Sequence, residues 1–335
     1  MAVFQYLVSI ATVGVIFSLL CLGLNMRYGW TGDLDLAYYM FGALGAYTYG
    51  VVTLPPAHLP PPDGYILGLS APFVLGILAA IAVAGLGSLI LGAIALRNLR
   101  GDYFAIVTIV TTLIVYATIS QYTPLFDGFS GLFGFTLPFN TVLQLDVETY
   151  PLFYLGVSIF FLVLVYLFCE RLFKSPFGRT MRAIREDDNA AMAFGRDVYR
   201  MKLKNYVVSG MIAGLGGALL SGWLTSWSPQ AWSPIETLLL YAAVFVGGTG
   251  NNRGVMIGAV FIFVFIQEIT RFIPTVHLGE TQLAASRTLL IGLLIIGVLW
   301  LRPQGLIPEP RAIDKDPNAP PPAKRPVPSS ELAVE

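Results

Sequence analysis

The chain has 335 residues, of which 56% are apolar and only 12% charged, and its mean hydropathy is +0.71. A soluble domain has about 25% charged residues, so the composition excludes an ordinary soluble protein and predicts an integral membrane protein. The formal net charge is zero, which gives no electrostatic reason to expect nucleic acid as a partner.

Nine apolar runs are candidates for membrane-spanning helices, because crossing the hydrocarbon core takes about 20 mostly apolar residues. The first run is too long for the core of a signal peptide, so we expect it to be retained as a helix. The predicted fold class is all-α: a polytopic integral membrane protein with about nine transmembrane helices. The expected spans are residues 3–26, 36–54, 71–96, 103–119, 151–169, 205–224, 235–248, 255–272 and 285–301.

The basic residues predict the orientation of these spans, because short loops rich in Lys and Arg stay in the cytoplasm. The connection 170–204 carries nine Lys and Arg residues and is therefore assigned to the inside. Alternation from this loop also places Arg27, Arg97, Arg253 and Arg302 inside, and it puts the N-terminus outside.

The seventh span is short, since residues 235–248 would rise only about 21 Å as a helix against a hydrocarbon core of about 30 Å. It runs into the glycine-rich polar stretch 247–254, which reads GGTGNNRG. Short, glycine-interrupted segments in transporters tend to mark broken helices beside a translocation path. A tight cytoplasmic turn is the alternative, and the sequence leaves both open.

The inside connection contains an amphipathic pattern between residues 177 and 195. Apolar side chains recur at i, i+4 and i+7, which predicts one helix with an apolar face, and a glycine follows as a C-terminal cap. The residues that make this pattern are Phe177, Met181, Ile184 and Gly195.

Such a helix can serve two purposes. It can lie on the membrane surface, where Arg182 and Arg185 would meet anionic lipid, or it can dock into a cytosolic partner. The acidic run Glu186, Asp187 and Asp188 would be repelled by anionic headgroups, which favours the docked helix.

Five stretches of sequence, spread over most of the chain, together resemble one known family. They are GWTG at 29–32 with GAYT at 45–48, RGDYFAIVT at 100–108, SPFGR and RAIRED at 175–187 with Ala190, Ala191 and Gly195, AGLGGAL at 213–219, and RPQGL at 302–306. In this order they resemble the LivM-type permeases of branched-chain amino acid ABC importers. The resemblance extends from about residue 20 to residue 307.

Three segments depart from the family pattern. Residues 33–38, DLDLAY, stand where the family usually has serine and small residues, and 247–253 and 126–132 replace two of its glycine-rich turns. These departures affect the expected cargo, because relatives of this type handle branched-chain amino acids, other amino acids, or urea and short amides.

The resemblance implies an ABC importer permease fold with a cytoplasmic coupling helix. Residues 1–303 would form the transmembrane permease domain, with 170–204 as its coupling loop, and 304–335 a disordered, proline-rich cytoplasmic tail. The residues expected to couple to an ATPase are Phe177, Met181, Arg182, Ile184, Arg185, Glu186, Ala190, Ala191 and Gly195.

The resemblance also implies a multi-subunit complex in the bacterial inner membrane. The expected partners are two ABC ATPase subunits that bind ATP and Mg, a second homologous permease subunit and an extracytoplasmic solute-binding protein. This chain itself is expected to hold no cofactor, metal or catalytic residue, since no nucleotide-binding loop, zinc-ligand pair or nucleophile elbow occurs in it.

Polar side chains within the spans are candidates for lining a translocation path. Thr108, Thr112 and Tyr116 recur at i, i+4 and i+8 along the fourth helix, and Asp35 and Tyr38 stand at the start of the second span. The threonines can instead bond back to their own helix, and Asp35 can simply cap the second helix.

Two functions of other classes compete with the importer. A stand-alone secondary transporter or channel would need a coupling carboxylate within the bilayer. Glu268 is the deep candidate in the sequence, and Arg271 follows at i+3, where the two can pair. A non-transporting scaffold is the other alternative, but it would not need the glycine-rich breaks.

Overall fold

The computed structural model describes residues 2–56, 67–98, 101–135, 137–139, 146, 148–266 and 304–309, together with 289, 292–293, 296–297 and 300. Within these residues the chain is mainly helical, and one short antiparallel pair of strands joins Leu132 to Trp227. The elements are α1 (Ala2–Thr31), α2 (Tyr38–Thr53), α3 (Phe73–Asn98), α4 (Gly101–Gln121), α5 (Thr123–Phe126), β1 (Leu132–Phe133), α7 (Tyr150–Lys174), α8 (Pro176–Glu186), α9 (Asp188–Ala193), α10 (Val198–Leu224), β2 (Ser226–Trp227), η1 (Pro229–Trp232), α11 (Pro234–Gly247), α12 (Asn252–Val260) and the π-helical turn η2 (Phe261–Ile266).

Five helices are long and apolar enough to cross a membrane: Val3–Thr31, Phe73–Arg97, Gly101–Gln121, Tyr150–Lys174 and Val198–Leu224. They match five of the nine expected spans, and the all-α membrane fold is confirmed. The helices α2 and α11, with 16 and 14 residues, also lie at expected spans but are shorter. The ninth span and the end of the eighth lie largely outside the described residues, so the count of nine stays a prediction.

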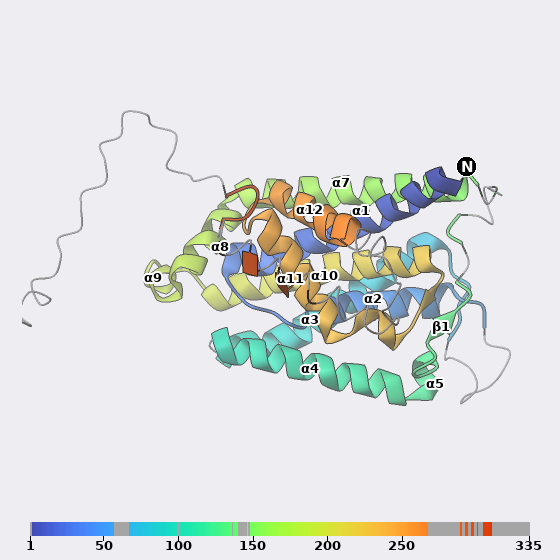
Figure 1. The fold of residues 1–335 in the computed structure, drawn as a ribbon. Helices are drawn as coiled ribbons and strands as arrows, with labels where there is room; N and C mark the ends of the chain where they lie inside the picture. Colours follow the sequence, from blue (N-terminus) through green and yellow to red (C-terminus); the bar gives the residue numbers. More distant parts are fainter. Residues whose placement is uncertain are drawn as a thin grey trace, which may run out of the picture.

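The helices run between two distinct ends of the molecule. Figure 1 places α8 and α9 at one end and α5, β1 and the N-terminus at the other. This arrangement agrees with the predicted orientation, in which the inside loop and the N-terminus lie on opposite sides of the membrane.

The centre of the bundle is the contact of α10 with α2, and glycines allow it. Gly45 faces Gly214, and a Cβ atom on Gly217 would overlap the carbonyl oxygen of Gly42. Small residues let helix backbones approach closely in membranes, where burial from water no longer drives association. Two of the stretches that carry the family resemblance, GAYT and AGLGGAL, therefore pack against each other.

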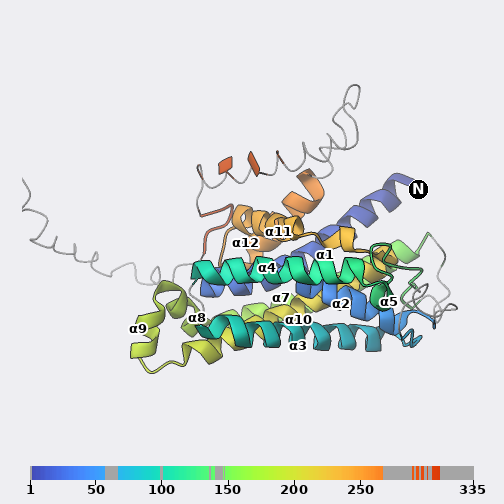
Figure 2. The same cartoon turned by 90° about the horizontal axis from the view of Figure 1, so that it is seen from below.

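In contrast, α4 lies at the outside of the bundle: it is at the lower edge in Figure 1 and in front of the other helices when seen from below in Figure 2. In its apolar 18-residue segment only 28% is buried inside the protein, against 72% in the corresponding segment of α10. Its buried positions include Thr108 and Thr112, so the predicted hydroxyl stripe is the face that α4 turns toward the protein.

The end of α11 settles the alternatives left by the sequence for residues 247–254. The helix stops at Gly247, Gly248 and Gly250 adopt positive φ angles of 109° and 81°, and α12 begins at Asn252 with Asn251 as its side-chain cap. This is a tight turn between two helices rather than a long break. It lies near α8, because Gly250 approaches Arg185, at the end of the bundle predicted to face the cytoplasm.

Residues 304–309, assigned by the sequence to the tail, pack against this turn. The Leu306 and Ile307 N–H groups donate to the carbonyl oxygens of Val246 and Gly247 at 2.8 and 3.1 Å. Gly305, with φ of +73°, lies against Gly248 so closely that a Cβ atom would not fit. The base of the tail is therefore part of the folded domain, and residues 310–335 lie outside the described residues.

Candidate transport path and coupling unit

The predicted single helix over 177–195 is two helices, α8 and α9, which together we term the coupling unit. Asp187 separates them because its backbone is extended, with φ −159° and ψ 110°. Its carboxylate accepts hydrogen bonds from the N–H groups of Asn189 and Ala190 at 2.8 and 3.1 Å. The single-helix prediction was wrong because Asp187 caps a new helix instead of continuing the old one.

The apolar stripe of α8 faces the body of the protein. Met181 and Ile184 are buried, and Phe177 is half-buried against the core. Ala191 of α9 is buried as well. These predicted coupling residues hold the unit to the bundle, so a cytosolic partner would meet the opposite side.

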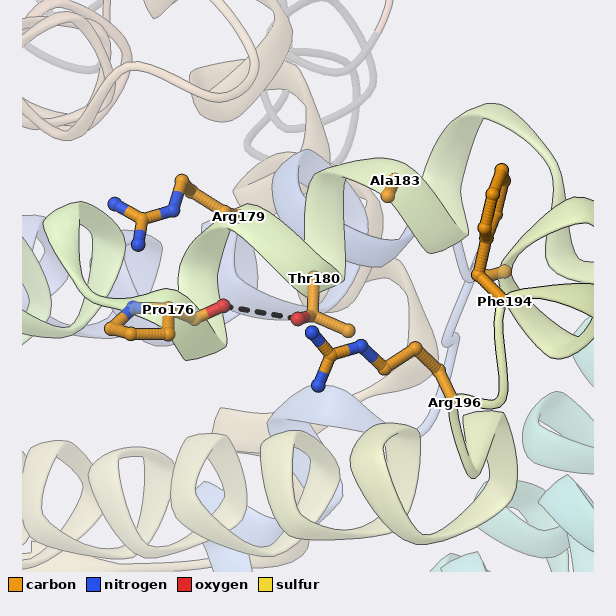
Figure 3. Close-up of a pocket in the computed structure, with 7 residues that line it drawn as sticks. Pro176, Arg179, Thr180, Ala183, Phe194 and Arg196 are labelled. Atoms are coloured by element: carbon orange, nitrogen blue, oxygen red, sulfur yellow. Dashed lines mark hydrogen bonds between the residues drawn. The ribbon is translucent and has the colours of Figure 1, made fainter.

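A groove of about 290 Å³ lies beside this buried face of the coupling unit. Its lining combines the apolar ring of Phe194, which is 86% exposed, with the basic side chains of Arg179 and Arg196. Figure 3 shows the groove between the two helices, with Thr180 donating a hydrogen bond to the carbonyl oxygen of Pro176 at its floor. The remaining lining residues are Ala183 and Ala191.

Gly195 ends α9 as the sequence predicted. Its φ angle is +76°, its N–H donates to Met192, and the following N–H of Arg196 donates to Ala191. This pair of bonds is the Schellman motif, which uses a left-handed residue and strongly favours glycine. Glu186 and Ala190 are exposed on either side of the break between the helices.

Two of the three arginines of α8, Arg182 and Arg185, bind inward rather than outward. Arg185 donates to the carbonyl oxygen of Gly29 and pairs with Glu309 at 2.7 Å. The guanidinium of Arg182 lies 4.4 Å from the ring centre of Phe173. Both predicted coupling residues thus join the coupling unit to the transmembrane helices.

Between α1 and α2 lies a non-helical segment, residues 32–37, which we term the junction. The helix α1 does not end near residue 26 as expected but continues to Thr31, so Arg27 lies inside it. Arg27 and Asp35 form an ion pair and are 1% and 0% exposed. The predicted end of the first span at residue 26 was wrong, because Asp35 pairs with Arg27 and allows it to lie buried within the helix; the placement of Arg27 on the inside stays a prediction.

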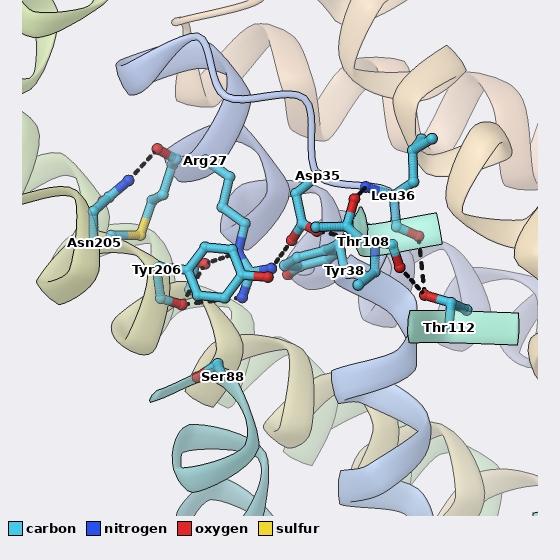
Figure 4. A network of polar contacts seen from close by, with 12 residues as sticks. Arg27, Asp35, Leu36, Tyr38, Ser88, Thr108, Thr112, Asn205 and Tyr206 are labelled. Carbon is cyan, nitrogen blue, oxygen red and sulfur yellow. Dashed lines mark hydrogen bonds and ion pairs between the residues drawn. The ribbon is translucent and has the colours of Figure 1, made fainter. Parts of the chain in front are cut away.

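Aromatic rings and backbone oxygens complete the site of Arg27, as Figure 4 shows. Its guanidinium lies 3.7 Å from the ring centre of Tyr206 and 4.8 Å from that of Phe41. It also donates to Ser209 and, at 3.0 Å, to the Tyr206 carbonyl oxygen. A buried charge is tolerated only when it is paired and hydrogen-bonded in this way.

Side chains satisfy the backbone of the junction. The Asp35 N–H donates to the Tyr241 hydroxyl at 2.8 Å, and the Leu36 N–H donates to Thr108 Oγ1 at 3.1 Å. The Ala37 N–H donates to Asp35 Oδ1 at 2.9 Å. Non-helical backbone at membrane depth requires such partners, because no water is available there.

The structure brings four of the five predicted path residues together around Leu36. Thr108, Thr112, Asp35 and Tyr38 are all buried, and the Tyr38 hydroxyl donates to the Leu20 carbonyl oxygen at 2.8 Å. Tyr116 lies apart, half-buried with its ring 5.4 Å from Trp232. The Ala37 N–H donates to Asp35, but α2 has no side-chain hydrogen bond at its N-cap, so Asp35 does not cap this helix, and its role in solute selection stays a prediction.

Sequence reasoning missed three residues of this site: Arg27, Tyr241 and Tyr206. One signal was present, since Arg27 directly follows an apolar run and carboxylates follow at 33 and 35. Nothing local marks Tyr241 or Tyr206, because they reach the junction from α11 and α10.

Comparison with known proteins agrees with this architecture. The model of one family, described as the permease component of branched-chain amino acid transport systems, matches residues 6–299. The chain is 30% identical over 330 residues to the high-affinity branched-chain amino acid transport system permease protein LivM of Escherichia coli K12, covering 91% of this chain and 70% of that protein.

Two further relatives widen the comparison. The probable branched-chain amino acid transport permease protein LivH of Methanocaldococcus jannaschii is 26% identical over 292 residues, covering 86% of this chain and 87% of that protein. The guanosine ABC transporter permease protein NupQ of Bacillus subtilis is 29% identical over 215 residues, covering 62% of this chain and 66% of that protein. No solved structure matches the chain.

Fold and site together define a multi-pass transport permease of the inner membrane. The chain belongs to the family of permease components of branched-chain amino acid transport systems, as the match over residues 6–299 and the LivM similarity show. The resemblance found in the sequence is thereby confirmed.

Proposed function

We propose that this chain is one permease subunit of an ATP-driven importer that moves branched-chain or related amino acids into the cytoplasm. The observation that carries the proposal is the coupling unit, which lies at the basic end of the bundle. It presents an open apolar and basic groove and is bonded to the last turn of α1, just before the junction, through Arg185 and Gly29.

The subunits that complete this importer follow from the surface of the chain. An ATPase dimer that binds ATP and Mg would dock on the α8–α9 groove, and this chain would bind neither. LivH and LivM are both named as branched-chain permeases, which supports a second, homologous permease as partner. An extracytoplasmic binding protein would deliver the solute at the end that carries α5 and β1.

The cargo is inferred from relatives. LivM and LivH, which match most of the chain, are named for branched-chain amino acids, while NupQ, a shorter match, is named for guanosine. None of these three relatives is named for urea or amides, so that alternative has no support beyond the departures at residues 33–38.

A stand-alone secondary transporter would need a free carboxylate in the bilayer to carry an ion or proton. Asp35 is buried at the junction, but Arg27 neutralises it, so it does not offer a free site. Glu268, the other candidate, lies outside the described residues. The paired state of Asp35 favours coupling to a partner over coupling to an ion.

Purification of the tagged chain from its native membrane tests the proposal. We expect ATPase subunits and a second permease to co-purify, and we expect the reconstituted complex to take up leucine, isoleucine and valine only with ATP. Isolation of the chain alone, with uptake that an ionophore abolishes, would contradict the importer. A preference for guanosine or amides would leave the importer standing and correct the cargo.

A groove variant localises the docking site. In Phe194→Ala with Arg196→Glu, the apolar and basic features of the groove are both lost, so we expect less ATPase to co-purify. Phe160→Ala is the matched control, since Phe160 is also exposed, at 62%, but lies on α7 away from the coupling unit. Equal recovery of ATPase with all three proteins would place the docking site elsewhere.

A further inference from the structure

One lysine connects the coupling unit with the junction. Lys202 Nζ lies 2.9 Å from Asp33 Oδ1 and 2.9 Å from Asp188 Oδ2. Asp33 belongs to the junction, Asp188 begins α9, and Lys202 lies near the start of α10. The junction thus meets α9 and α10, two elements far along the sequence from it, at a single ammonium group.

This contact is more protected from solvent than the other ion pair near the start of α10. The side chains of Lys202 and Asp33 are 13% and 16% exposed, whereas those of Arg200 and Asp197 are 78% and 52% exposed. Exposed pairs are screened by water and salt and hold little in place. The Lys202–Asp33 half of the bridge is therefore sheltered, whereas Asp188 on the coupling unit is 45% exposed.

Only a short stretch of chain separates Asp33 from the predicted path. Leu36, three residues further on, is bonded to Thr108 of α4 through its N–H group. Three extended residues span about 10 Å at most. A displacement of Asp33 therefore reaches the contact between the junction and α4 with little chain in between to absorb it.

The coupling unit also holds the chain just before the junction. Arg185 of α8 donates to the carbonyl oxygen of Gly29, two residues before the end of α1. The junction is non-helical, so its backbone angles can change without breaking helical hydrogen bonds, as at hinges in other proteins. A contact from α8 and a contact from α9 through Lys202 thus bracket the start of a deformable segment.

We propose that Lys202 is a positioning residue that transmits movement of the coupling unit to the junction and, through Leu36, to α4. This inference deepens the proposed function and rests on it, because it needs a partner that moves the coupling unit. Removing the ammonium group leaves two carboxylates facing each other. Their repulsion would separate α9 from the junction and uncouple the movements.

The test uses the complete complex in proteoliposomes and measures solute taken up per ATP hydrolysed. In Lys202→Gln we expect this ratio to fall by about fivefold or more, the lower end of typical coupling between sites. Lys202→Arg keeps the charge and should restore most of the ratio. Lys204→Gln is the matched control, because Lys204 is exposed on the same helix and makes no ion pair within the described residues.

A double-mutant cycle keeps the inference testable if Lys202→Gln fails to assemble. Asp33→Asn and Asp188→Asn should each lower the ratio, and the double variant should be no worse than the stronger single one, because both act through one lysine. Independent, additive effects would overturn the inference, as would an assembled Lys202→Gln complex with an unchanged ratio. Absence of ATP-driven uptake in the unmodified complex would instead contradict the proposed function itself.

Discussion

The coupling unit and the junction use charge in opposite ways, although Lys202 bridges them through Asp188 and Asp33. The groove on the coupling unit leaves Arg179 and Phe194 exposed. At the junction, Arg27 and Asp35 are paired and almost completely buried. The comparison indicates that charge in the coupling unit serves recognition, whereas charge in the junction holds an irregular backbone inside the bundle.

The difference has a consequence for stability. Taking one partner from a buried ion pair leaves a charge that water cannot reach, and it typically destabilises a protein by about 3–5 kcal/mol. Taking a charge from an exposed surface costs little in stability. Substitutions in the two regions should therefore separate loss of folding from loss of function.

The largest effect is expected at the buried pair. Asp35→Leu leaves Arg27 without its carboxylate and should destabilise the protein by about 3–5 kcal/mol, measured as thermal unfolding in detergent. The double variant Arg27→Met with Asp35→Leu should recover most of this loss, because apolar replacement of a complete pair is often neutral. Equal destabilisation of the single and double variants would show that the pair is not the reason.

A second substitution of Asp35 tests whether this residue takes part in solute selection. Asp35→Ser retains a small polar group, and because Asp35 is buried we expect the order of preference among amino acids and amides to stay unchanged while uptake falls. Competition uptake with leucine, alanine and acetamide measures that order. A reordered preference would mean that Asp35 takes part in selection and that the junction opens to the solute.

A smaller effect is expected where α4 meets the junction. Thr108→Val removes the hydroxyl that accepts the Leu36 N–H, and an unpaired buried donor costs about 1–3 kcal/mol. Thr111→Val is the matched control, since the Thr111 hydroxyl donates back to Val107 of its own helix. We expect lower thermal stability and less uptake only in the first variant. Similar behaviour of both variants would show that the hydrogen bond between Thr108 and Leu36 has no special role in stability or uptake.

In the coupling unit the expected defect is functional. Gly195→Val forces a β-branched residue to a φ angle of +76°, although open space surrounds the position, and left-handed backbone costs about 1–2 kcal/mol. The end of α9 should rearrange, so ATP hydrolysis should continue while uptake falls. Gly134→Val is the matched control, because Gly134 also has a φ angle of +77° and open space around it but lies at the opposite end of the bundle. Uptake should stay coupled to ATP hydrolysis in this variant.

The sequence predicted the parts of this fold that depend on local composition. Five apolar runs identify the long spans, the period of Phe177, Met181 and Ile184 identifies the face of α8, and Gly195 identifies the end of α9. It did not predict the break at Asp187, although an aspartate before a second helical run is a common capping signal. That residue was instead counted as part of an acidic cluster.

The contacts of the junction could not be predicted from the sequence for a different reason. Arg27 looks like a loop residue because an arginine in lipid is costly, and only the fold shows that Asp35 returns to neutralise it. The hydroxyls of Tyr241 and Thr108 that satisfy the junction backbone come from helices far along the chain. Local patterns cannot specify such contacts. The GAYT and AGLGGAL stretches differ, because close helix packing requires small residues and these are visible in the sequence.

The smallest effect is expected at the end of the described chain, where the 304–309 segment covers the turn after α11 and contacts the coupling unit. Glu309 pairs with Arg185, and both side chains are partly exposed, at 22% and 28%, so the pair should contribute only about 0–1 kcal/mol. Truncation after Glu309 keeps the pair and removes residues rich in proline and charge, which should leave uptake within about twofold of the full chain.

Truncation after Gln304 also removes the hydrogen bonds from Leu306 and Ile307 to the end of α11. It should lower both thermal stability and uptake, because the turn beside the coupling unit loses its cover. If both truncations abolished uptake alike, residues 310–335 would have a docking site of their own. If neither had an effect, the 304–309 segment would be a passive covering of the turn.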